Sequence, residues 1–127
     1  MHEWSLACQL VREAEAEAER RNAVKVFGVT VSIGQLTGIV PELLTRAYDM
    51  ARMGTLLEDA ALEVEIESVK GRCAECGRES FIQGFGLMCP ECGALGLEVL
   101  SGDDILLTKM DLEVREEPFR GHGGVHV

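Results

Sequence analysis

Apolar residues near the start of the chain recur at steps of three and four, the spacing of one face of an α-helix. No Gly or Pro interrupts the stretch from Ser5 to Arg21. The opposite face is rich in glutamate, and Glu17 precedes Arg21 by four residues, which is the favourable order for an ion pair on a helix. The pattern therefore predicts an amphipathic helix with a solvated acidic face. Its apolar positions are Leu6, Leu10, Val11, Ala14 and Ala18.

The following segment changes to the two-residue period of a β-strand with one buried face. We expect its buried residues to be Phe27, Val29, Val31 and Ile33. A loop then leads to Pro41, which suits the first turn of a second helix, and Gly54 suits the end of that helix. Its apolar positions are Leu43, Leu44, Ala47, Met50 and Ala51.

Three more strands are predicted, over 62–66, from Leu97, and over 106–114, with a turn at 101–104 before the last. We expect the strands on both sides of the cysteine segment to join one sheet, with that segment inserted between them. The predicted fold class is α+β, a small mixed sheet with two helices plus an inserted four-cysteine ribbon. The predicted domains are 1–70 with 96–114 for the main domain and 71–95 for the ribbon, and 115–127 is expected to be a disordered tail.

Two copies of Cys-x-x-Cys-Gly stand 12 residues apart in the middle of the chain. The two-residue gap lets both sulfurs of one copy reach the same ion, and the glycine permits the left-handed turn that follows. The pattern predicts a structural zinc site with four thiolate ligands, which leaves no position for water or substrate. A rubredoxin-like iron centre and a labile disulfide pair are the alternatives. The ligands are Cys73, Cys76, Cys89 and Cys92.

Composition restricts the class of protein. Apolar residues make up 46% and aromatic residues 5% of the 127 residues, which predicts an aliphatic core. No apolar run approaches the roughly 20 residues of a membrane span, and no signal peptide is evident, so we expect a cytoplasmic protein that does not bind membranes. The net charge of -10 disfavours nucleic acid as a partner, although a nucleic-acid-binding zinc ribbon is the main alternative function.

The start of the chain offers a second kind of metal site. The Met1 amine, the deprotonated backbone nitrogen of His2 and its Nδ1 can close fused chelate rings in one plane. Planar nitrogen donation suits Ni(II) or Cu(II), and Glu3 can add a fourth donor. The alternative interpretation is a frayed chain end.

Several segments together resemble one known family. They are Met1-His2-Glu3-Trp4-Ser5-Leu6, Ile33-Gly34, Val40-Pro41-Glu42-Leu43-Leu44 and the paired Cys-x-x-Cys motifs. In this combination the chain, from residue 1 to about 114, resembles the HypA family of hydrogenase-maturation nickel chaperones.

The resemblance implies a small nickel-binding α/β domain joined to a zinc ribbon. It implies a nickel site at Met1, His2 and Glu3 and a zinc site at the four cysteines. It further implies delivery of Ni(II) to the precursor of the [NiFe]-hydrogenase large subunit, together with the GTPase HypB. The residues themselves offer no open metal site near a general base, no Ser/His/Asp or Cys/His set and no phosphate-binding glycine loop, so we expect that the chain is not an enzyme. Urease remains a second client to consider, and we expect a monomer or weak dimer. His122 and His126, beyond the usual family end, are interpreted as part of a mobile tail.

Overall fold

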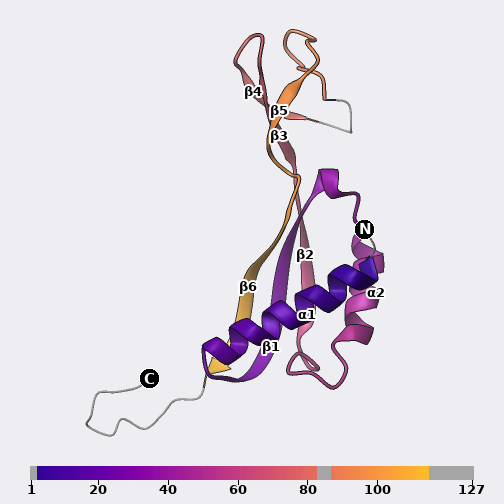
Figure 1. The fold of residues 1–127 in the computed structure, drawn as a ribbon, viewed down its shortest axis with the longest axis vertical. Coiled ribbons are helices and arrows are strands. Elements are labelled where there is room, and N and C mark those ends of the chain that lie inside the picture. Colours follow the sequence, from indigo (N-terminus) through magenta and orange to yellow (C-terminus); the bar gives the residue numbers. More distant parts are fainter. Residues whose placement is uncertain (1–2, 83–86, 115–127) are drawn as a thin grey trace, which may run out of the picture.

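The computed structural model describes residues 3–82 and 87–114. These residues form two α-helices, one short 3-10 helix and two three-stranded sheets, arranged end to end (Figure 1). In chain order the elements are α1 (Glu3–Arg20), β1 (Ala23–Gly34), η1 (Gln35–Thr37), α2 (Pro41–Ala51), β2 (Ala61–Glu67), β3 (Val69–Cys73), β4 (Glu79–Ile82), β5 (Leu97–Ser101) and β6 (Ile105–Val114).

The first helix begins two residues before the predicted start, at Glu3, and ends at Arg20. Asn22 then adopts a left-handed backbone with φ of 58°, a conformation that Asn tolerates at helix ends. This turn sends the chain back as β1. The predicted apolar stripe is confirmed, since all five of its positions are buried together with Ala7.

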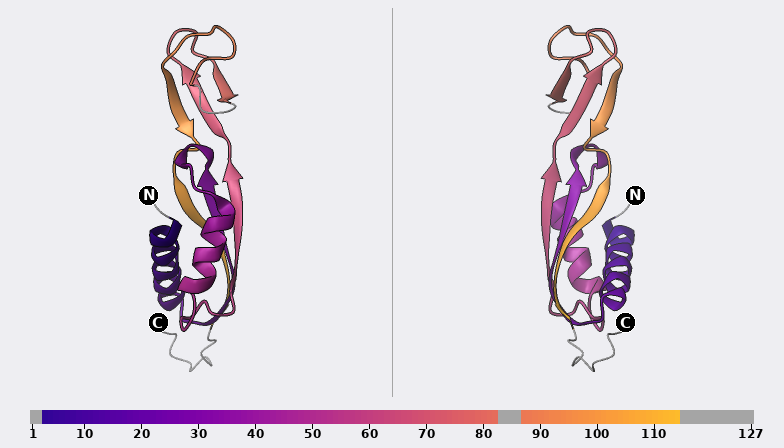
Figure 2. Two further views of the ribbon diagram at one scale, coloured as in Figure 1. Left: turned by 90° about the vertical axis from the view of Figure 1, so that its right-hand side faces the viewer. Right: turned by 90° about the vertical axis from the view of Figure 1, so that its left-hand side faces the viewer.

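The first sheet has the strand order β2-β1-β6, with β1 parallel to β2 and antiparallel to β6. Both helices lie on one face of this sheet (Figure 2). Since β1 and β2 are parallel neighbours, the connection that contains α2 must cross from one end of the sheet to the other. The predicted mixed sheet with two helices is confirmed.

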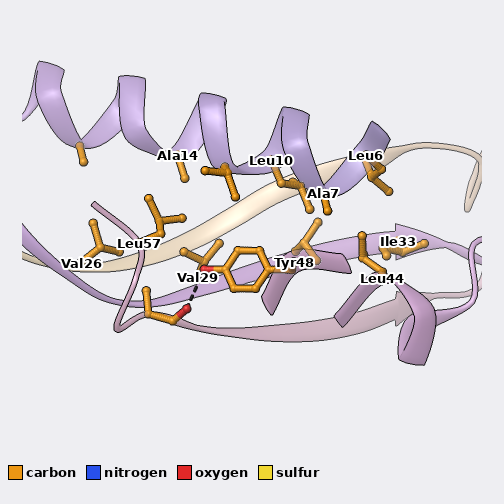
Figure 3. Close-up of a cluster of buried hydrophobic side chains, with 14 of the residues drawn as sticks. Leu6, Ala7, Leu10, Ala14, Val26, Val29, Ile33, Leu44, Tyr48 and Leu57 are labelled. Atoms are coloured by element: carbon orange, nitrogen blue, oxygen red, sulfur yellow. Dashed lines mark hydrogen bonds between the residues drawn. The ribbon is translucent and has the colours of Figure 1, made fainter. Parts of the chain in front are cut away.

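The main core lies between the helices and the first sheet and is largely aliphatic, as predicted (Figure 3). Its one large polar-tipped side chain is Tyr48, whose hydroxyl donates a hydrogen bond of 2.6 Å to the carbonyl of Ala60. The prediction that Phe27 is buried is wrong, because the pairing of β1 with β6 shifts between Val26 and Gly28. The extra residue of this irregularity is Phe27, which is 50% exposed, and Val26 is buried instead.

The second sheet has the order β4-β3-β5, and both pairings are antiparallel. The strands β2 and β6 join the first sheet as expected, but the strand that begins at Leu97 does not. It pairs with β3, with Leu97 opposite Cys73. Gly102, with φ of 94°, breaks the strand before β6, so that the chain changes sheets there. The proposed domain boundaries stay a prediction, since adjoining sheets do not establish which segments fold independently.

The two sheets meet where the backbones of Gly34 and Gly102 touch. The Gly34 N–H donates to the carbonyl of Asp104 and the Leu36 N–H to that of Gly102, each at 2.8 Å. A Cβ at Gly34 would lie 2.2 Å from the carbonyl carbon of Gly102. Leu36 also packs against the small core of the second sheet, so η1 fastens the ribbon to the first sheet.

Candidate metal centre

The first Cys-x-x-Cys-Gly sequence forms a tight turn at the end of β3. The Gly77 N–H donates to the carbonyl of Cys73 at 2.8 Å, and the Cys73 N–H donates to the carbonyl of Arg78 at 3.0 Å. Gly77 has φ of 73°, a conformation that a residue with a side chain rarely adopts. This geometry is the reason that the sequence needs glycine directly after Cys76.

The second sequence repeats the same turn. The Gly93 N–H donates to the carbonyl of Cys89 and the Cys89 N–H to that of Ala94, both at 2.9 Å, and Gly93 has φ of 77°. The two turns therefore present their cysteines in the same way, as predicted from the repeated spacing.

The four sulfur atoms converge on one point. Sγ of Cys73 lies 3.5 Å from that of Cys92, Sγ of Cys76 lies 3.8 Å from that of Cys89, and all four lie within 4.8 Å of one another. A tetrahedron with metal–sulfur bonds of about 2.3 Å has edges of about 3.8 Å, so the cluster has the size that a four-thiolate ion requires. A disulfide bond is much shorter, about 2.05 Å, and all the cysteines are free.

Backbone N–H groups favour the thiolate form of the two buried cysteines. The Cys76 N–H and the Glu75 N–H each donate to Cys73 Sγ at 3.4 Å, and the Cys92 N–H donates to Cys89 Sγ at 3.5 Å. These bonds lower the pKa of Cys73 and lower that of Cys89 to about 7, against the opposing effect of burial.

The two exposed cysteines hold their protons more tightly. The Ala94 N–H acts to lower the pKa of Cys92. The neighbouring Cys73 sulfur and the partial loss of hydration around the Cys92 sulfur outweigh this effect and raise that pKa to about 12. The pKa of Cys76 is also raised, because burial and the adjacent sulfurs outweigh the Arg78 N–H. A bound cation must therefore displace protons from the exposed pair, whereas the buried pair is partly prepared for it.

The charged side chains of the ribbon pair with one another. Lys70 and Arg72 lie 3.3 and 2.8 Å from Glu79, and Arg72 also lies 3.5 Å from Glu98. Arg78 lies 3.8 Å from Glu91 and so connects the two cysteine turns. Every cation in the described part of the ribbon thus has a carboxylate beside it, which leaves little positive surface for phosphates.

Glu3, predicted as a nickel ligand, begins α1 and contacts the start of α2. Its Oε2 accepts a hydrogen bond of 3.1 Å from the N–H of Val40, the residue that precedes the first turn of α2. In a capping box the third residue of the helix supplies the carboxylate that accepts from this N–H. That residue is the apolar Leu43 in α2, and the carboxylate of Glu3 takes its place. Met1 and His2, like His122 and His126, lie outside the described residues.

The contact between Glu3 and Val40 was not predicted from the sequence. A backbone donor has no sequence signature, and 37 positions separate the two residues. The sequence also gave no indication that Leu36 covers the ribbon core. The exposed apolar side chains beside this contact, Trp4, Val40 and Leu43, are 51%, 42% and 48% exposed.

No helix in the described part of the chain is long and apolar enough to cross a membrane.

Comparison with solved structures finds the same fold in the solution structure of the Ni metallochaperone HypA from Helicobacter pylori. The TM-score is 0.70 at 24% identity, and the match covers 91% of this chain and 100% of that one. A second solution structure of a HypA protein matches with a TM-score of 0.69 at 23% identity, covering 91% of this chain and 98% of that one.

Sequence comparison gives closer relatives. The hydrogenase maturation factor HypA of Aquifex aeolicus is 41% identical over 114 residues, which are 90% of this chain and 99% of the relative. That of Chlorobium luteolum is 33% identical over 117 residues, 92% of this chain and 100% of the relative. The family model described as hydrogenase/urease nickel incorporation, metallochaperone, hypA matches residues 1–112. The chain therefore belongs to the HypA family of nickel metallochaperones.

Proposed function

We propose that this chain binds Ni(II) through the Met1 amine, His2 and Glu3 and delivers it during maturation of a [NiFe]-hydrogenase large subunit. Family membership supports the nickel-related role. The observation that supports the location is the hydrogen bond between Glu3 Oε2 and the Val40 N–H. This hydrogen bond holds Glu3 where α1 and α2 both begin. Because each residue spans at most about 3.6 Å, ligand atoms of Met1 and His2 can reach only the neighbourhood of these helix starts.

The position favours release as much as binding. The amino-terminal ends of helices carry partial positive charge, which disfavours a cation there. A nickel site there needs anionic donors that offset this partial positive charge. Of the three proposed ligands, Glu3 is the anionic one and the one that lies among the described residues. A site made from consecutive residues near helix ends should therefore hold nickel less firmly than a preformed cage, which suits an ion that is passed on.

Titration of nickel into the full chain, followed by calorimetry, tests the ligands. His2→Ala should remove most of the affinity, and the matched control His126→Ala should leave it unchanged. One extra residue before Met1 should also weaken binding, because it moves the amine out of the chelate. Unchanged affinity in His2→Ala would refute the proposed site.

The role of Glu3 can be separated into charge and geometry. Glu3→Gln keeps an oxygen for the Val40 N–H and removes the negative charge, whereas Glu3→Ala removes both. If the carboxylate binds nickel, both variants lose affinity. If Glu3 only anchors α1 to α2, Glu3→Gln should bind nickel like the natural chain.

Acidification provides a further check. The imidazole of His2 must be neutral to bind, and an unperturbed His titrates near about 6.5, so nickel should be lost below that pH. A nickel affinity that is the same at pH 5.5 and 7.5 would argue against His2.

We further propose that the four-cysteine cluster holds structural zinc, supported by the separations of the sulfur atoms. Metal analysis of the purified chain should give one zinc per chain and no visible absorption. A red colour with thiolate-to-iron bands would instead assign the cluster to the iron alternative.

The proposed partners are the GTPase HypB and the hydrogenase precursor, with urease as a second client to test. We propose no catalytic activity of the chain's own, and a cytoplasmic location, where reducing conditions keep thiols free. The alternative function, a nucleic-acid-binding ribbon, is disfavoured by the ion pairs of Lys70, Arg72 and Arg78. A salt-sensitive mobility shift with DNA or RNA would support that alternative.

A further inference from the structure

The first sheet has two outer edges of different character. Among the described strands, β2 and β6 each pair only with β1, so each has one edge without a partner (Figure 1). An unpaired edge is a template for another strand unless its side chains oppose pairing. The charges along the two edges therefore indicate what each can accept.

The edge formed by β2 carries a row of like charges. Glu63, Glu65 and Glu67 alternate along it and lie on the face of the sheet opposite the helices, with Glu63 opposite Thr30 and Glu65 opposite Ser32 in β1. Antiparallel pairing with a second copy of β2 would bring these glutamates together, and like charges on opposed strands are destabilising. This edge is protected against self-association.

The edge formed by β6 has balanced charges. Lys109 and Asp111 are 67% and 60% exposed, and Lys109 Nζ lies 4.0 Å from Asp111 Oδ1, so both lie on the same face of the sheet. Met110, between them, points to the helix side, where it packs against the main core. Beside this edge a groove of about 440 Å³ runs between β6 and the end of α1, and its two other charged side chains, Glu17 and Arg21, form an ion pair.

We propose that a second copy of the chain pairs with β6 in antiparallel fashion, about a two-fold axis at Met110. Lys109 then lies opposite the partner's Asp111, and Asp111 lies opposite the partner's Lys109. The two sheets become one, in the order β2-β1-β6-β6-β1-β2. An axis at Asp111 would place Lys109 opposite the partner's Glu113 but would oppose the Asp111 carboxylate to its own copy. The axis at Met110 keeps two attractive pairs without that repulsion and is therefore favoured.

The match is short. The pairing of β6 with β1 shifts at Thr108, which marks a bulge where regular strand geometry stops. From Lys109 onward β6 has no extra residue of its own, although β1 carries extra residues opposite it, Phe27 among them. The regular stretch of β6 is short, and the dimer is therefore weak and depends on concentration.

Charge reversal tests the pairing in the full, zinc-loaded chain. In Lys109→Glu the homodimer would oppose Glu to Asp, and in Asp111→Lys it would oppose Lys to Lys. Each variant should dimerise at least about tenfold more weakly by sedimentation, since two attractive pairs become repulsive. The charge-matched control Arg46→Glu, on exposed α2 surface, should dimerise normally.

Mixing the two variants is the decisive step. In the mixed dimer the chain with Lys109→Glu presents two carboxylates to the two lysines of the chain with Asp111→Lys. Two attractive pairs across the interface are thereby restored. Heterodimers should therefore form with about the natural affinity. A monomeric natural chain at millimolar concentration, undisturbed dimers in the single variants, or no gain on mixing would each overturn the proposal.

A cross-link tests the register independently. In a Cys8→Ser background, Met110→Cys should form a disulfide between copies, because residues directly opposite on antiparallel strands have Cα atoms about 4.5–5.5 Å apart. Glu113→Cys is the control, since its two copies would be six positions, or about 20 Å, apart along the strands. A cross-link in Glu113→Cys but not in Met110→Cys would overturn the register.

Discussion

Single residues stabilise this fold through hydrogen bonds of two kinds, those between residues close in the sequence and those between distant segments. The cysteine turns work locally, through hydrogen bonds that span only a few positions, such as Gly77 N–H to Cys73. Glu3 acts at long range, because its carboxylate joins the first residue of α1 to the residue before α2. Tyr48 also acts at long range and fixes the chain just before β2.

Tyr48→Phe should lower the free energy of unfolding by about 1 kcal/mol, the usual net value of one hydrogen bond. The lost bond is the one from the Tyr48 hydroxyl to Ala60, whose carbonyl keeps its second donor, Arg52, at 2.9 Å. Urea denaturation at neutral pH measures the change. No loss of stability would mean that the bond contributes nothing net.

The same side chain should also make the fold sensitive to alkali. Burial raises the pKa of Tyr48 to about 12, above its value of about 10 in an unfolded chain. The folded state thus holds the proton more tightly, and this stabilisation is complete below pH 10 and disappears as the pH rises toward 12. In Tyr48→Phe this part of the decline in stability should be missing from a series of unfolding curves recorded across that pH range.

Secondary-structure elements were predictable where the signal is local. Both helices, and the strands that alternate strictly, were read from periodicity, and the cysteine site from spacing. Strand β5 was assigned to the wrong sheet because its partner depends on where the backbone turns at Gly102, and the bulge at Phe27 depends on register with a strand far along the chain. Contacts between elements, such as those of Leu36 and Val40, leave no periodic pattern.

At the same scale, Gly34→Ala should be strongly destabilising, by about 3 kcal/mol or more, because the new methyl group would overlap backbone that cannot move alone. Gly28→Ala in the same strand is the control. Its Cβ would meet only the end of the Asp111 side chain, at 3.2 Å, which can rotate away. Thermal unfolding should separate the two variants clearly, and equal melting temperatures would contradict the account of the junction.

At the scale of the whole molecule, the described residues form a large core and a small one, which should differ in their dependence on metal. The described ribbon core has five buried residues, two of which are the cysteines Cys73 and Cys89. So small a core cannot by itself offset the entropy of ordering the chain, and a metal held by the four cysteines would supply much of the ribbon's stability.

Removal of the metal proposed for the four-cysteine cluster, with a chelator, should therefore unfold the ribbon first. Hydrogen exchange should show loss of protection in β3, β4 and β5, while α1 and β1 stay protected. Cys76→Ser should reproduce this result, and Cys8→Ser, outside the cluster, should not. Equal loss of protection in both sheets would mean that the two cores unfold as one unit.

The packing of Leu36 on the ribbon core limits how freely this ribbon can be reused as a module. A peptide from Val69 to Gly102 would carry all four cysteines but would leave uncovered the surface that Leu36 occupies. Transplantation into another scaffold would need a substitute apolar side chain at that place, together with a donor for the carbonyl of Gly102. An insertion that supplies both should fold when metal is added, whereas one that carries only the cysteines should bind metal but remain loosely packed.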